Sequence, residues 1–118
     1  MPELRLEPRD PDRAGGGGAV STQTERSLDN AAELRRLAGI ARDEAHRAMA
    51  AGGMAEGAEW LRKAERGERV ASSIEARAEA ARYQAQAINH RNVGHFDQAD
   101  EAERMARDAE RRAAEVAP

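Results

Sequence analysis

The chain lacks cysteine and has few aromatic side chains. With no cysteine among its 118 residues, disulfides, thiolate nucleophiles and cysteine-ligated zinc sites are excluded. Aromatic residues make up 3% of the sequence, and 27 alanines outnumber the 20 residues that Val, Ile, Leu, Met, Phe, Trp and Tyr supply together. Burying an alanine methyl gains little beside the roughly 1.5–3 kcal/mol of a large apolar side chain. We therefore expect a monomer of marginal stability that gains from self-association or a partner.

The sequence also lacks a long apolar run and an excess of basic charge. No stretch approaches the roughly 18 apolar residues of a membrane span, and the N-terminus has no secretory signal, so we expect a cytoplasmic protein without membrane contact. The net charge is −3, and acidic and basic residues alternate along the predicted helices, which is typical of solvated helix surfaces and disfavours nucleic acid as the main ligand. Arginine-rich, alanine-rich composition indicates a GC-rich bacterial genome.

Proline and glycine are concentrated near the N-terminus. Three of the four prolines and a run of four glycines precede residue 19, and this segment has almost no apolar surface to bury. We predict a flexible, disordered N-terminal tail over residues 1–21 and one helical domain over residues 22–118.

Small and apolar residues recur at alternating spacings of three and four, which keeps one stripe of an α-helix facing one neighbour. The longest such seam consists of Gly57, Trp60, Ala64, Gly67, Ala71, Ile74, Ala78, Ala81, Ala85 and Ile88. Shorter alanine-rich seams run from Ala31 to Ala48 and from Ala99 to Val116. These seams predict an all-α fold, a coiled-coil-like helical bundle whose helices approach closely. Trp60 and Phe96 are expected to be its two large anchors.

The seams predict three long antiparallel helices over residues 22–51, 54–91 and 95–116. Ser and Thr side chains between residues 21 and 24 are suited to cap the first helix. Gly52 and Gly94 are suited to end the first and second helices, because glycine adopts the left-handed conformation of a helix end. Gly67 either breaks the second helix or permits close approach along an unbroken one.

The middle helix carries a second stripe opposite its main seam, formed by Ala76, Ala80, Tyr83 and Ala87. A helix that is apolar on two sides is expected to lie between two other helices. If a helix covers this stripe, Tyr83 belongs to the core. If none does, Tyr83 among these alanines is a candidate hot spot for binding a protein partner.

A basic cluster on the same helix is a candidate surface for nucleic acid, although Glu59, Glu65 and Glu68 are interspersed with it. Its members are Arg62, Lys63, Arg66 and Arg69.

No catalytic, cofactor-binding or metal-ligating residue is predicted. The string from Asp43 to His46 spells a helicase box, but the phosphate-binding loop that such a box requires is missing, so we interpret it as a solvated patch. His90 and His95 flank the second turn and are interpreted as surface turn residues rather than zinc ligands. The hydroxyls of Ser72 and Ser73 are expected to bond to the preceding turn or to water.

The two turns share a pattern, with Gly94-x-Phe96-x-x-Ala99 at the second and Gly52-x-Met54-x-x-Gly57 at the first. The pattern resembles the opening of the second helix in a tetratricopeptide repeat, and the related three-helix microtubule-interacting-and-transport domains. This resemblance implies binding of peptides or helices of partner proteins. It is confined to the turns, and Glu103 stands where the family prefers an aromatic residue, so no binding residues carry over.

These features favour a non-catalytic helical protein–protein interaction or scaffold module, without cofactor, that forms a homo-oligomer. The alternative is a small regulator that contacts nucleic acid, or an enzyme acting on nucleic acid, through the basic cluster.

Overall fold

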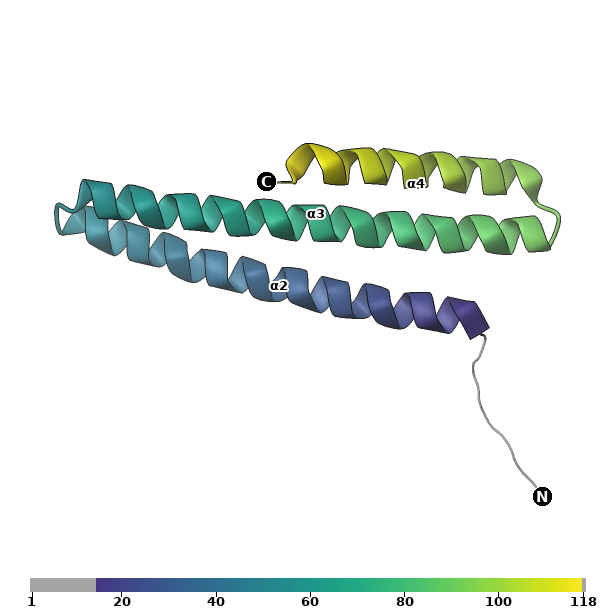
Figure 1. The fold of residues 1–118 in the computed structure, drawn as a ribbon, viewed down its shortest axis with the longest axis horizontal. Coiled ribbons are helices and arrows are strands. Elements are labelled where there is room, and N and C mark those ends of the chain that lie inside the picture. Colours follow the sequence, from purple (N-terminus) through teal and green to yellow (C-terminus); the bar gives the residue numbers. More distant parts are fainter. Residues whose placement is uncertain (1–14, 118) are drawn as a thin grey trace, which may run out of the picture.

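The computed structural model describes the backbone of residues 15–117 and the side chains of residues 22–117. Three helices follow one another, each antiparallel to the next: α2 (Gly15–Ala50), α3 (Met54–Asn92) and α4 (Phe96–Val116) (Figure 1). The predicted all-α fold of three long helices is therefore confirmed. In the described part of the chain, no helix combines the length and the apolar character that crossing a lipid bilayer requires. Residues 1–14 of the predicted tail lie outside the described residues.

The first helix is longer than predicted, because it begins at Gly15 rather than at residue 22. The predicted cap is also wrong: Thr24 lies well inside α2, with 7% of its surface exposed. Each glycine in a helix interior costs about 1 kcal/mol relative to alanine. That cost lowers helix propensity without forbidding the helix, so the run of four glycines forms the first turn of α2.

Both turns have the same backbone construction, and glycine is required in each. Gly52 and Gly94 adopt positive φ angles of 89° and 83°, which residues with a side chain rarely adopt. The residue after each glycine donates its N–H to the carbonyl five residues back, at 2.7 Å for Gly53 and 2.8 Å for His95. This is the Schellman arrangement of a helix end. Each turn is therefore short, and the next helix must run antiparallel.

Helix α3 is continuous through Gly67. A Cβ atom added there would lie 3.7 Å from the carbonyl oxygen of Leu34 and 3.8 Å from the Cβ of Ala38. Both are ordinary van der Waals distances. The glycine thus neither breaks the helix nor is demanded by close packing at this level.

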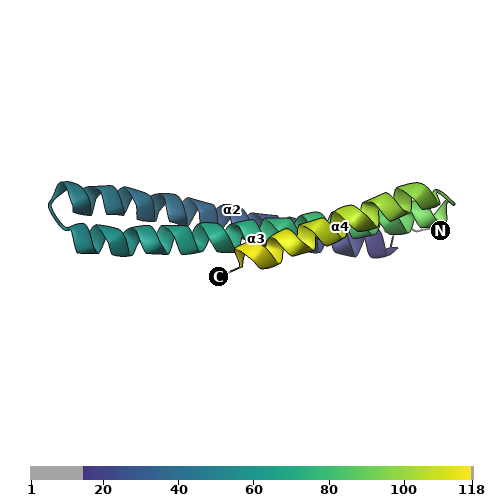
Figure 2. The ribbon, with the colours of Figure 1, turned by 90° about the horizontal axis from the view of Figure 1, so that it is seen from above.

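The three helices form a single layer. Helix α3 contacts α2 along one side and α4 along the other, while α2 and α4 do not contact each other. Seen along its edge, the layer is twisted but one helix thick (Figure 2), and its Cα atoms span 15 Å along the shortest axis. The prediction that the middle helix lies between the other two is confirmed. Within the described residues, no further element covers either broad face of the layer.

Alanine forms the interior of this layer. Every fully buried hydrophobic side chain among the described residues is an alanine, and no large side chain is fully buried. Ala38, Ala41 and Ala64 form a cluster between α2 and α3, with Trp60 packed against it. Because the layer is one helix thick, the only enclosed positions are those between neighbouring helices, and close helix approach favours small residues there.

Candidate functional site

The second stripe of α3 is covered by α4. Ala76, Ala80 and Ala87 are 8%, 3% and 3% exposed, so these three candidate partner-binding residues form part of the intramolecular core. Tyr83 is half-buried and is the member of the stripe that still reaches the surface. The stripe packs against the alanine seam of α4, which runs from Ala99 to Ala113.

Ser73 also belongs to this stripe. It was not predicted there from the sequence. It is 4% exposed, and its hydroxyl donates to the carbonyl oxygen of Ala113 in α4 at 3.2 Å. The expectation that this hydroxyl bonds to its own helix or to water is wrong. A signal was present, since Ser73 stands three residues before Ala76 and continues the spacing of the stripe. Its bond places the last turn of α4 beside Ser73 of α3.

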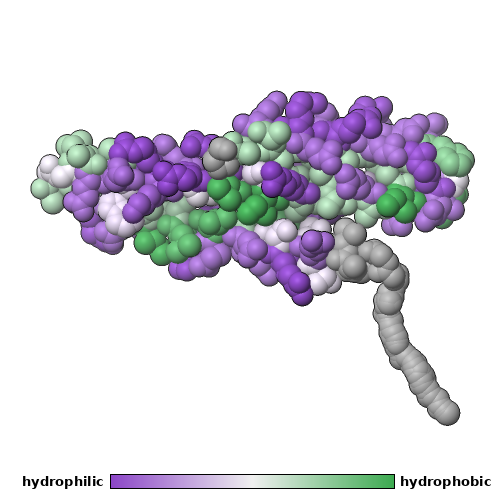
Figure 3. Space-filling model, viewed as in Figure 1, coloured by the Kyte–Doolittle hydropathy of each residue, from purple (hydrophilic) through white to green (hydrophobic). Residues whose placement is uncertain are grey.

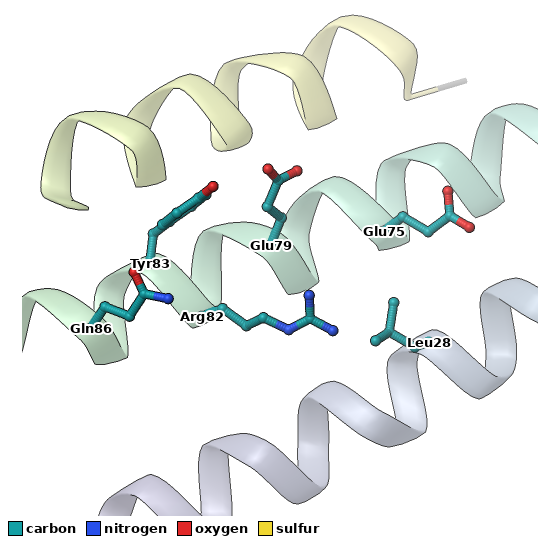
Figure 4. Close-up of a pocket in the computed structure, with 6 residues that line it drawn as sticks. All are labelled: Leu28, Glu75, Glu79, Arg82, Tyr83 and Gln86. Carbon is teal, nitrogen blue, oxygen red and sulfur yellow. The ribbon is translucent and has the colours of Figure 1, made fainter. Parts of the chain in front are cut away.

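Tyr83 borders two open hollows, one on either side of α3. The hollow toward α2 has a volume of about 340 Å³ and is lined by Leu28, Glu75, Glu79, Arg82, Tyr83 and Gln86 (Figure 4). In that view, Arg82 extends toward α2, whereas Tyr83 and Glu79 point toward α4. The hollow toward α4 has a volume of about 440 Å³ and shares Tyr83 and Gln86 with the first. Polar and charged side chains line much of the hollow toward α2, whereas the hollow toward α4 has a largely apolar lining that includes Ala102 and Met105.

One broad face of the layer carries ion pairs that join α2 to α3. Arg35 donates to both carboxylate oxygens of Glu75 at 3.0 and 2.7 Å, and Arg42 donates to both of Glu68 at 2.9 and 2.7 Å. Hydrogen bonds from these guanidinium groups lower the pKa of each carboxyl group below its ordinary value. We call this surface the charged face and define it by Arg35, Arg42, Glu68 and Glu75. Its charges are neutralised within the chain.

The opposite broad face carries apolar side chains among charged ones. Successive helix residues are rotated by about 100°, so a residue two positions from a member of the charged side points to the other face. Charged residues stand in such positions, namely Glu33, Glu44 and Arg77 (from Arg35, Arg42 and Glu75). The apolar residues there are Leu37 (from Arg35), Ile40 (from Arg42), Val70 (from Glu68) and Ile88, which stands five helical turns after Val70 and points the same way. We call them the apolar face; Leu37, Ile40 and Ile88 are 47%, 46% and 61% exposed. Figure 3 shows strongly apolar surface over α2 and α3 near the middle of the layer.

The basic cluster lies along the edge of α3, and its members do not form one compact group. All four are exposed: Arg62, Lys63, Arg66 and Arg69. The Lys63 ammonium lies over the ring of Trp60, 4.6 Å from its centroid. Arg62 forms an ion pair with Glu59, and this hydrogen bond, with the charges of Lys63 and Arg66 nearby, lowers the pKa of Glu59. Among the described residues, the other two arginines have no recorded ion pair.

Ion pairs also hold α4 against α3 at the second turn. Arg91 donates to Glu103 at 2.6 Å and to Asp100 at 3.3 Å. The hydrogen bond to Glu103 raises the pKa of Arg91. Further along, Arg112 donates to Glu79 at 3.2 Å. Glu103 therefore has a structural role here, as a partner of the preceding helix.

The histidines near the second turn are close to each other, with ring centroids 6.1 Å apart for His90 and His95. The same two residues are joined by the backbone hydrogen bond of the turn, which explains the proximity of their rings. Asp43 and His46 are exposed on α2. Among the described residues, no group of three or more His, Asp or Glu side chains is arranged to hold a metal ion.

The two predicted anchors differ. Trp60 packs against the alanine cluster as expected, but Phe96 is 59% exposed, so its prediction as a core anchor is wrong. Phe96 is the first residue of α4 and precedes the covered part of its seam. Ile88, predicted on the main seam, is 61% exposed. Helix α2 diverges from α3 with distance from the first turn (Figure 1), so the seam loses its partner before it ends.

Compared with protein-family models, with curated proteins and with solved structures, the chain matches none of them.

Proposed function

We propose that this chain is a non-catalytic protein–protein interaction module of the cytoplasm that associates with itself through its apolar face. The observation that carries the proposal is the single layer itself. Protein domains normally consist of two or more packed layers around one core. In this layer, Leu37, Ile40 and Ile88 keep about half of their surface or more in contact with solvent. A second layer would cover them.

The apolar face, rather than the charged face, is the surface left for a partner. Arg35 and Arg42 already pair with carboxylates of α3, whereas Leu37 and Ile40 have no second layer above them. A second copy offers a surface of matching chemistry, and a two-fold axis would place the same patch on both sides of the interface. The resemblance of the turns to tetratricopeptide-type elbows supports the same class of function.

Light scattering of the purified full chain tests this proposal. We expect the mass of a dimer or a larger oligomer, and we expect Leu37→Gln/Ile40→Gln to shift the protein toward the monomer. The matched control is Met105→Gln, which removes an apolar side chain, 37% exposed, that lines the hollow beside Tyr83. It should keep the wild-type mass. A stable monomer at all accessible concentrations would refute self-association.

Nucleic-acid binding through the basic cluster is the weaker alternative. The exposure of Arg66 and Arg69 favours it, but the net charge of −3 and the intermixed glutamates oppose binding to a phosphate backbone. A duplex DNA probe distinguishes the two functions, as described below.

A further inference from the structure

The α4-facing stripe of α3 continues past the end of α4. Where α4 covers it, the stripe consists of Ser73, Ala76, Ala80, Tyr83 and Ala87. The same alternation of four and three residues, read toward the N-terminus from Ser73, reaches Arg69, Arg66 and Arg62 in succession. The stripe therefore consists of alanine, serine and one tyrosine where α4 lies on it, and of arginine where none of the described helices covers it. We call these three residues the arginine edge.

The arginine edge has room for another helix in line with α4. Helix α4 runs three residues beyond Ala113, to about the level of Val70, so the uncovered side of α3 extends from Met54 for about 24 Å, at 1.5 Å per residue. Helix α4 shows what this side of α3 accepts, because it packs there through a seam of the same spacing. Side chains at these positions point into the space that a coaxial helix would fill.

The charge of the edge selects its occupant. Guanidinium groups form paired hydrogen bonds with carboxylates. Among the described residues Arg66 forms no ion pair, whereas Arg62 shares its charge with the exposed Glu59 of its own helix. A second copy does not suit the edge, since two arginine edges would repel. A phosphate backbone extends beyond the edge along a chain whose net charge is −3, whereas a short acidic helix contacts the edge alone.

We propose that the arginine edge docks an acidic helical segment of a partner protein, placed end to end with α4. This proposal adds a second binding surface to the proposed interaction function. It rests on that function only in assuming that the partner is a protein. Arg69 has a further role, because it stands one helical turn from Ser73, at the C-terminal end of α4, where a positive charge is favourable. Arg62 and Arg66 lie beyond that influence, so they are the residues to test.

The test is fluorescence anisotropy with a labelled helical probe peptide of about 16 residues, which spans the roughly 24 Å of the uncovered side. The probe consists mostly of alanine and carries glutamates at alternating spacings of three and four. We expect binding at low salt, weaker binding of a peptide with the same glutamates spread around the helix, and at least tenfold weaker binding by Arg62→Gln/Arg66→Gln. The matched control, Arg77→Gln/Arg107→Gln, removes two exposed arginines elsewhere and should bind as the wild type does.

Three results would overturn the proposal: no binding at low salt, equal binding by Arg62→Gln/Arg66→Gln, or tighter arginine-dependent binding of a duplex DNA probe. The last result would assign the edge to nucleic acid. Light scattering of the same variants separates the two proposals, because the arginine edge and the apolar face share no residue. If a variant loses probe binding but keeps its oligomeric mass, its substitutions affect the arginine edge and leave self-association unchanged.

Discussion

The two halves of α3 differ in how many neighbours they have. The N-terminal half, up to Ser73, packs against α2 only, while the C-terminal half lies between α2 and α4 (Figure 1). On the α4 side, the residue type changes at the same level, from Arg66 and Arg69 to Ala76 and Ala80. One helix thus carries two different surfaces at equivalent positions. A repeating spacing defines which side of a helix a residue occupies, and the residue type indicates whether another helix covers it.

Overpacking tests this difference most strongly. Ala80 and Arg66 stand fourteen residues apart at equivalent positions of the stripe, and Ala80 is 3% exposed. We expect Ala80→Leu to lower the free energy of unfolding by about 1–3 kcal/mol, because the added carbons meet α4. Arg66→Leu should change it by less than about 0.5 kcal/mol. Urea unfolding followed by circular dichroism measures both, and equal losses would contradict the assignment of covered and uncovered halves.

Two glycines of the N-terminal half test how closely α2 approaches. A Cβ at Gly57 would lie 2.4 Å from the Cγ of Met49 and 3.1 Å from the carbonyl oxygen of Ala45, whereas Gly67 has room for one. Gly67→Ala should therefore raise the free energy of unfolding by about 1 kcal/mol, because alanine has the higher helix propensity. Gly57→Ala should lower it by about 1 kcal/mol, because strain exceeds that gain. Thermal unfolding that ranks the two variants in the opposite order would disprove this packing.

Loss of one buried hydrogen bond tests the boundary between the halves. Ser73→Ala removes the donor to the Ala113 carbonyl, and we expect a loss of about 1 kcal/mol together with faster hydrogen exchange in the last turn of α4. Ser72→Ala is the control, since the Ser72 hydroxyl accepts from Arg35 at an exposed position. It should leave exchange in α4 unchanged. If hydrogen exchange in α4 is the same in the two variants, the last turn of α4 does not pack beside Ser73.

Acid should weaken the contact between α2 and α3, and we expect this effect to be smaller than those of the substitutions above. The pKa values of Glu68 and Glu75 are lowered in the folded chain by Arg42 and Arg35. Their contribution is therefore fully present above the unfolded pKa of about 4.3 and is lost as pH falls through the lower folded values. Because both pairs are largely exposed and screened by solvent, we expect the loss of stability to be small. Denaturant midpoints at pH 7 and pH 3 measure the loss, which Arg35→Gln/Arg42→Gln should reduce.

Local rules predicted the helices and turns because Gly52, Gly94 and the alanine seams act through nearby residues. The positions of Ile88 and Phe96 could not be predicted in this way, since a seam does not reveal where its neighbour diverges or begins. The candidate site was predicted in part: the second stripe was found, but its cover by α4 turned its alanines into core. Leu37 and Ile40 were missed because they lie outside every seam, and only the single-layer arrangement exposes them.

Both proposals depend on α2 and α4 lying on opposite sides of α3, and a distance between those two helices tests this most directly. The chain has no native cysteine, so Ala32→Cys/Glu115→Cys accepts two spin labels at exposed positions of α2 and α4. Double electron–electron resonance on labelled protein diluted with unlabelled chain should give a distance between the two spin labels of two interhelical spacings, about 16–20 Å. A separation of one spacing, about 8–10 Å, would show a closed bundle and contradict the single layer.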